Sequence, residues 1–193
     1  MGRVTGKVKQ FATIRKHSEG KIERRSKDKV IMAIDINDFR GLANLAKRNQ
    51  VDVSDFDKNG DTLLARAIQA VSSESAEFLM KQGCPVDTQN KYHETPLHWA
   101  CLNRLDSIVQ TLVRLTSDIN YPSYNGYTPL HCAVRGGCIS CVQILLENQA
   151  KVDYYSDHQL TPLMMAVSDG NIEMTKLLLQ YGASAKAVDK YNQ

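Results

Sequence analysis

Cysteine and histidine are the residue types in this chain whose spacing could support chemistry. Cys138 and Cys141 are separated by two residues, and His131 lies shortly before them. Thiolate and imidazole ligands at such spacing can hold zinc. The sequence has no second cysteine pair at zinc-finger spacing, so we interpret these two cysteines as structural residues. We therefore predict no metal site and no cofactor.

A nucleophile and its base could be sought in Cys101 with His98, or in Cys132 with His131. The two histidines are 33 residues apart, and each lies inside the same short motif. A residue that recurs at the same position of successive repeats is expected to stabilise the repeat structure. These side chains are therefore predicted to be packing and hydrogen-bonding groups. The sequence also has no phosphate-binding glycine loop, HExxH helix or nucleophile elbow. We predict that the protein is not an enzyme.

A six-residue motif recurs every 33 residues. Its copies are Thr62–Ala67 (TLLARA), Thr95–Ala100 (TPLHWA), Thr128–Ala133 (TPLHCA) and Thr161–Ala166 (TPLMMA). Repeats at this period indicate a solenoid. Thr suits a helix N-cap, and Pro suits the first helical position, where no N–H donor is needed. Leu can face a core, Ala allows a neighbouring helix to approach, and His can bond backbone across a turn.

The period and the motif TPLHxA resemble those of the ankyrin repeat family. The resemblance covers roughly residues 27–193. It implies an all-α solenoid, an ankyrin repeat array of helix-turn-helix units joined by β-turn loops and stacked side by side.

The repeat pattern divides the chain into segments. We predict a basic, flexible N-terminal extension (1–26), a divergent N-terminal capping repeat (27–56), repeats over 57–89, 90–122, 123–155 and 156–188, and the start of a further repeat or a closing turn (189–193). The repeat over 57–89 departs from the motif because Leu63 replaces Pro and Ala65 replaces His. A polar helix pair that would cap the C-terminal end is missing. Leu177 and Leu178 are therefore expected to be partly exposed unless further repeats or a partner cover them.

Charge is distributed unevenly along the sequence. Residues 1–30 carry ten basic and three acidic residues, a net +7, whereas the remainder carries −4. Val4, Val8, Phe11 and Ile14 form a weak helical stripe in this extension. The extension could be a solvated tail, a nuclear-import patch around Arg24–Lys27, a contact for anionic membrane or a partner-binding helix. Nucleic acid or membrane binding is not expected outside residues 1–29, because the body is net acidic.

The five cysteines are predicted to be reduced thiols in a cytoplasmic or nuclear protein, since no signal peptide is visible. No apolar run approaches the ~20 residues that a membrane-spanning helix needs. We therefore predict that the protein is neither secreted nor transmembrane.

The family resemblance implies binding through a concave surface, formed by the turn tips and the exposed face of the first helices. The candidate partner-binding residues are Tyr92, Glu94, Trp99, Leu102, Asn103, Tyr124, Asn125, Tyr127, Arg135, His158, Leu160 and Asp169. The second repeat would present Lys58, Asn59, Asp61 and Gln69. Tyrosines and Arg are common interface anchors, although some of the tyrosines could instead cover neighbouring turns.

These observations predict a non-catalytic protein-protein interaction module: an adaptor, an inhibitor or a regulatory subunit that binds one or more protein partners. The alternative is a localisation module whose basic extension docks on anionic membrane or nucleic acid.

Overall fold

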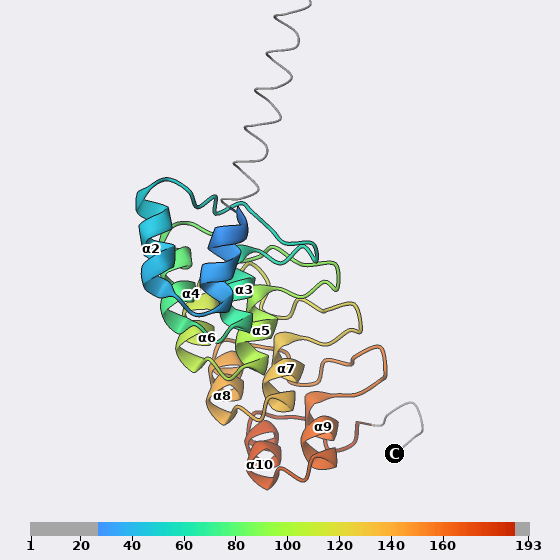
Figure 1. The fold of residues 1–193 in the computed structure, drawn as a ribbon. Helices are drawn as coiled ribbons and strands as arrows, with labels where there is room; N and C mark the ends of the chain where they lie inside the picture. The colour runs from blue at the N-terminus through green and yellow to red at the C-terminus, as the bar shows by residue number, and fades with distance from the viewer. Residues whose placement is uncertain (1–26, 188–193) are drawn as a thin grey trace, which may run out of the picture.

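Pairs of antiparallel helices stack in one continuous row (Figure 1). The computed structural model describes residues 27–187, so the predictions for 1–26 and 189–193 lie outside the described residues. A first helix covers 27–35. It is followed by α2 (Phe39–Lys47), α3 (Leu63–Gln69), α4 (Ser73–Lys81), α5 (Pro96–Leu102), α6 (Asp106–Leu112), α7 (Pro129–Arg135), α8 (Ile139–Glu147), α9 (Pro162–Ser168) and α10 (Ile172–Gln180). Within 27–187 the only strand-like pairing is one isolated bridge. The predicted all-α solenoid is confirmed; the exact repeat boundaries stay a prediction.

The helices form two layers. In the inner layer α3 packs against α5, α5 against α7, and α7 against α9; in the outer layer α4 packs against α6, α6 against α8, and α8 against α10. Long loops project to one side of the row, beyond the inner helices (Figure 1). Between the layers lies a continuous core of buried aliphatic side chains, including Leu64, Leu97 and Leu130 from the inner helices. None of the described helices is long and apolar enough to span a membrane.

The recurring Thr starts each inner helix. Thr62 Oγ1 accepts a hydrogen bond from the Ala65 N–H at 3.2 Å, and Thr161 Oγ1 accepts from the Met164 N–H at 3.3 Å. Thr95 and Thr128 are N-caps with Pro in the first helical turn. The cap satisfies a backbone donor that would otherwise lack a partner. The divergent second repeat thus keeps its cap although it lacks Pro.

The motif histidines join consecutive repeats. His98 Nδ1 accepts from the Thr95 N–H at 3.1 Å, and its Nε2 lies 3.1 Å from the Tyr127 carbonyl oxygen in the next repeat. His131 repeats this arrangement with the Leu160 carbonyl oxygen, also at 3.1 Å. Since Nδ1 accepts a hydrogen bond, Nε2 carries the proton and donates to the carbonyl. Each neutral imidazole therefore fixes the next turn against the inner helix before it.

Backbone proximity between α5 and α7 depends on Gly136. A Cβ atom at this position would lie 2.6 Å from the Leu102 carbonyl oxygen and 3.0 Å from that of Cys101. Both atoms belong to backbone, which cannot move away as a side-chain end can. The inner helices can approach this closely here only because the residue has no side chain.

We predict that Gly136→Ala lowers the free energy of unfolding by about 1–3 kcal/mol, because α5 and α7 must separate to accept the methyl group. Urea unfolding followed by circular dichroism measures the change. Gly137→Asn is the matched control: Gly137 has a φ of +67°, which Asn tolerates, and no atom lies within 4 Å of a Cβ built there. An equal loss in both variants would contradict the close-approach explanation.

The histidine links also predict a pH dependence of stability. Burial lowers the pKa of His98 and of His131 from 6.5 to about 4. In the unfolded chain the imidazoles take up protons at higher pH, so their contribution is complete above pH 6.5 and is lost as the pH falls toward 4. We expect protonation of each imidazole to lower the free energy of unfolding at pH 5 by about 1–2 kcal/mol relative to pH 7. Urea unfolding at pH 7 and pH 5 measures the loss.

The control is the His98→Gln/His131→Gln double variant, whose amides can accept and donate as the imidazoles do but do not titrate. Its unfolding free energy should change less between pH 7 and pH 5 than that of the wild type. Equal slopes would show that other groups carry the pH dependence.

Candidate protein-binding surface

The turn tips of successive repeats are joined by backbone hydrogen bonds. The Lys91 N–H donates to the Asn59 carbonyl oxygen at 2.9 Å, and the Tyr124 N–H donates to the Tyr92 carbonyl oxygen at 2.9 Å. The third bond of this series runs from Asp157 to Asn125 at 3.1 Å. We call the tips and the exposed face of the inner helices the tip surface. Its backbone is one connected row, so side chains from different repeats hold fixed relative positions.

All twelve candidate residues reach solvent to some degree. Tyr92, Tyr124, Asn125, Arg135, His158 and Asp169 are exposed; Glu94, Trp99, Leu102, Asn103, Tyr127 and Leu160 are partly buried. Tyr124 is 71% exposed and Tyr92 is 52% exposed, which are large fractions for aromatic residues. The two exposed tyrosines offer large contact area at fixed positions on the surface.

The structure brings several candidates together around Tyr127. Its ring centroid lies 6.3 Å from that of His158 and 5.5 Å from that of His131, and the Arg135 Cζ atom lies 5.9 Å from it. Tyr124 instead contacts the His93 ring, with centroids 6.2 Å apart. The sequence offered two interpretations of the tyrosines, as interface residues or as residues that cover neighbouring turns. Tyr127 fits both, because it packs on the structural His131 and also contributes to the surface.

Other candidates are occupied with structural contacts. Asn103 Nδ2 donates to the Ile68 carbonyl oxygen at 3.0 Å, which joins α5 to α3. Glu94 accepts from Asn90 Nδ2 at 3.1 Å, and burial raises the pKa of its carboxyl, with a smaller contribution from Asp61. Trp99 packs against the core, and its buried Nε1 has no partner among residues 27–187. These side chains are less available to a partner than the tyrosines.

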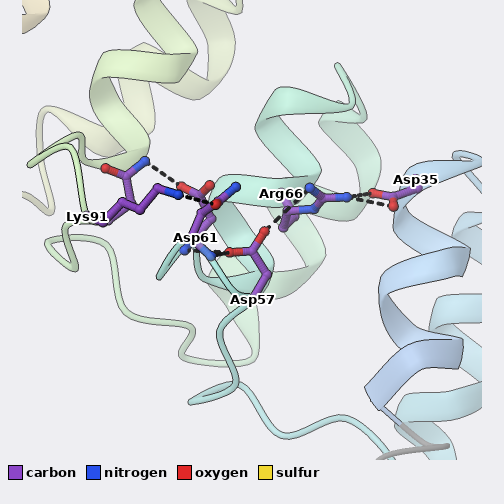
Figure 2. Close-up of polar contacts among 7 residues, drawn as sticks. Asp35, Asp57, Asp61, Arg66 and Lys91 are labelled. Atoms are coloured by element: carbon purple, nitrogen blue, oxygen red, sulfur yellow. Dashed lines mark hydrogen bonds and ion pairs between the residues drawn. The ribbon is translucent and has the colours of Figure 1, made fainter.

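The second repeat replaces the missing histidine link with carboxylates (Figure 2). Asn90 Nδ2 donates to Asp61 Oδ1 at 2.9 Å, which ties the second turn to the third. Asp61 is therefore only 4% exposed, and the prediction that it faces solvent is wrong. Arg66 bridges Asp35 of the first helix and Asp57 of the second turn, at 3.5 Å from the latter. These acidic side chains hold the first repeats together.

Sequence reasoning named only Trp99 from one row of the tip surface and missed the other members. Trp99, Cys132 and Met165 occupy the same position of successive motifs, and all three are partly exposed and packed against the core. In the second repeat this position is Arg66. This row could have been found from the fifth residue of the motif, which differs between the copies. A position that changes between copies is not required by the fold.

The cysteines do not form a site of the kinds considered. Burial raises the pKa of Cys132 to about 12 and that of Cys101 well above its usual range, which disfavours the nucleophilic thiolate. The structure joins Cys138 and Cys141 as a disulfide, so the expectation of five reduced thiols is wrong for this pair. Cys138 also caps α8, where its Sγ accepts from the Cys141 N–H at 3.2 Å. Within residues 27–187, no cluster of three or more His, Cys, Asp or Glu could hold a metal.

In the part of the chain that the structure describes, the C-terminal end of the row is partly exposed, although Leu178 does not contribute to this exposure. Leu178 is fully buried, which contradicts the expectation, whereas Leu177 is partly exposed as expected. Val167 is 59% exposed, while Val134, one repeat earlier, is 3% exposed. Because the next repeat covers Val134, the exposed Val167 marks a stacking face of the fifth repeat that no residue of 27–187 covers.

Comparison with known proteins agrees with this architecture. A family model described as ankyrin repeats matches residues 30–123 and 116–189, which together make up most of the chain. The chain belongs to the ankyrin repeat family, whose members are generally non-catalytic protein-binding modules. It is similar to Rabankyrin-5 of Homo sapiens, with 33% identity over 88 residues. That match covers 46% of this chain and only 7% of the length of Rabankyrin-5.

The third turn holds a residue under backbone strain. His93 has a φ of +60°, at the position where the second and fourth turns have Gly60 and Gly126. We predict that His93→Gly raises the unfolding free energy by about 0.5–1 kcal/mol, because glycine adopts this conformation without steric cost. Urea unfolding measures it, and His93→Ala is the control, since it removes the ring and keeps the strained Cβ. Equal effects of the two substitutions would mean that the ring, and not the backbone, decides the change.

Proposed function

We propose that this chain is a non-catalytic adaptor, inhibitor or regulatory subunit that binds a protein partner through the tip surface of its third, fourth and fifth repeats. The observation that carries the proposal is the grouping of Tyr92, Tyr124 and Tyr127 on hydrogen-bonded tips, two of them more than half exposed. Tyr and Arg are enriched among residues that dominate binding energy. A tyrosine also loses little conformational entropy on binding, because only two side-chain torsions are ordered.

A rigid backbone under these side chains favours affinity. The tips are tied to one another and, through His98 and His131, to the inner helices. A surface that is ordered before binding avoids the cost of ordering it on binding. This supports recognition of a partner by side chains whose positions are fixed before binding, and not by a loop that folds on binding.

The alternative, a localisation module, depends on the basic N-terminal extension. In the described part, Lys27 is committed to Asp55 at 3.1 Å and lies over the Phe56 ring. Lys29 is described too and is exposed, whereas the basic residues within 1–26 precede the described region. Binding that falls steeply with salt and disappears when residues 1–26 are removed would favour this alternative.

We also propose that a partner or further repeats cover the open C-terminal end. Ile172 and Leu179 of α10 are 70% and 43% exposed, whereas Leu146, which precedes Leu179 by one repeat, is 8% exposed. Stacking another helix pair would bury these side chains as it does in the earlier repeats. For cellular location, we propose the cytoplasm or nucleus. The free thiols of Cys84, Cys101 and Cys132 support this location, whereas the disulfide between Cys138 and Cys141 is uncommon there.

We predict that Tyr124→Ala/Tyr127→Ala weakens partner binding by about thirtyfold or more, since loss of an interface anchor costs about 2 kcal/mol or more. A pull-down from native extract, read by quantitative mass spectrometry, compares wild-type and variant chains. Circular dichroism and urea unfolding verify the fold of each chain.

The matched control is Leu115→Ala, which removes an exposed apolar side chain after the outer helix α6, outside both the tip surface and the C-terminal end. It should retain the partners of the wild type. If the folded double variant keeps the same partners in the same amounts, the proposed surface is not the binding site.

A further inference from the structure

Two cations lie beside the tyrosine rings of the tip surface. Lys91 Nζ is 4.9 Å from the Tyr92 ring centroid, and Arg135 Cζ is 5.9 Å from the Tyr127 ring centroid. Lys91 and Arg135 are both exposed. An exposed cation–π contact contributes only about 0.5–1 kcal/mol, so it biases the position of the cation without neutralising its charge. The aromatic part of the surface therefore carries positive charge.

Three acidic side chains at the other end of the row, Asp35, Asp55 and Asp57, form ion pairs within the molecule. Arg66 is paired with Asp35 and Asp57, and Lys27 with Asp55 (Figure 2 shows the Arg66 pairs). These are the ion pairs found among residues 27–187. These three carboxylates are thus used within the molecule.

Lys91 and Arg135 have no such partner. Lys91 Nζ donates to the neutral Asn59 Oδ1 at 2.8 Å, and within the described chain its charge meets no carboxylate. The Arg135 guanidinium, which offers five N–H donors, donates no hydrogen bond to any residue of 27–187. Its planar fork matches the two oxygens of a carboxylate. Both cations are available to a group that the protein does not supply.

The acidic candidate residues and turn residues of the third and fifth repeats do not neutralise this charge. Glu94 is partly buried and accepts from Asn90. Asp157 and Asp169, in the fifth repeat, are exposed, and neither forms an ion pair with Lys91 or Arg135. Salt weakens the long-range repulsion between these carboxylates and an acidic ligand. A ligand carboxylate bound directly to Arg135 would be partly desolvated, so salt would screen that contact less.

We propose that the tip surface recognises an acidic peptide segment: one or more Asp or Glu side chains beside an aromatic or aliphatic residue. The carboxylate binds Arg135, with Lys91 contributing charge, and the apolar neighbour packs on Tyr92, Tyr124 and Tyr127. This inference rests on the proposed function, because it assigns the chemistry of the partner at the same surface. A protein carboxylate is favoured over nucleic-acid phosphate because members of this family generally bind proteins.

The test is selection of a random peptide library on the immobilised chain, followed by affinity measurement of the enriched peptides by fluorescence polarisation. Enriched sequences should contain Asp or Glu next to an aromatic or aliphatic residue. Arg135→Glu should weaken binding about thirtyfold or more, Arg135→Lys should weaken it less, and added salt should weaken wild-type binding. Arg114→Glu, which reverses an exposed charge after α6, is the matched control and should bind as the wild type does.

The outcomes separate this inference from the proposed function. Peptides that need Tyr124 and Tyr127 but lack acidic residues, or that tolerate Arg135→Glu, would overturn the acidic-segment proposal and leave the binding surface standing. Absence of any peptide that depends on the tyrosines would overturn both. Competition by a short single-stranded RNA as strong as that by the unlabelled peptide would also overturn it, in favour of nucleic acid. In the supporting result, the peptide's Asp or Glu→Lys derivative binds the Arg135→Glu variant better than the wild type.

Discussion

The hydrogen bond from a motif imidazole to a carbonyl in the next repeat is the constraint on which the tip surface depends. His98 and His131 each use both ring nitrogens, one to accept from the capping Thr and one to donate across the repeat boundary. The acceptor in the first case is the carbonyl of Tyr127 itself. A residue proposed to bind a partner is therefore positioned by the same bond that joins two repeats.

Burial makes these bonds effective and also makes them sensitive to protonation. Water is excluded from His98 and His131, which are 2% and 0% exposed, so the neutral imidazole is favoured and each ring keeps one acceptor and one donor. The second repeat solves the same problem without histidine, through Asp61 and Asn90. Different side chains thus fulfil one geometric requirement: a polar connection between the turn of one repeat and that of the next.

The sequence predicted the fold well because the motif residues act locally. Thr, Pro and Leu determine where an inner helix starts and which face it buries, and their period determines the stacking. The wrong predictions concern long-range contacts. Asp61 is buried because Asn90 of the next repeat reaches it, and Leu178 is buried in the continuous core, as Leu145 is one repeat earlier. His93 in a left-handed conformation shows that stacking can impose a backbone shape that the local sequence does not favour.

The candidate site was predictable as a region but not in detail, because its residues are those that the fold does not require. Equivalent tip positions carry Lys58, Lys91, Tyr124 and Asp157, or Asn59, Tyr92, Asn125 and His158. Their backbones nevertheless make the same cross-repeat hydrogen bonds, which involve only N–H and carbonyl groups. Since these bonds are independent of the side chains, the tips can change chemistry at little cost in stability. The local excess of tyrosine and unpaired cations in the third and fourth repeats therefore has no structural cause among these bonds, and recognition of a partner explains it more directly than packing does.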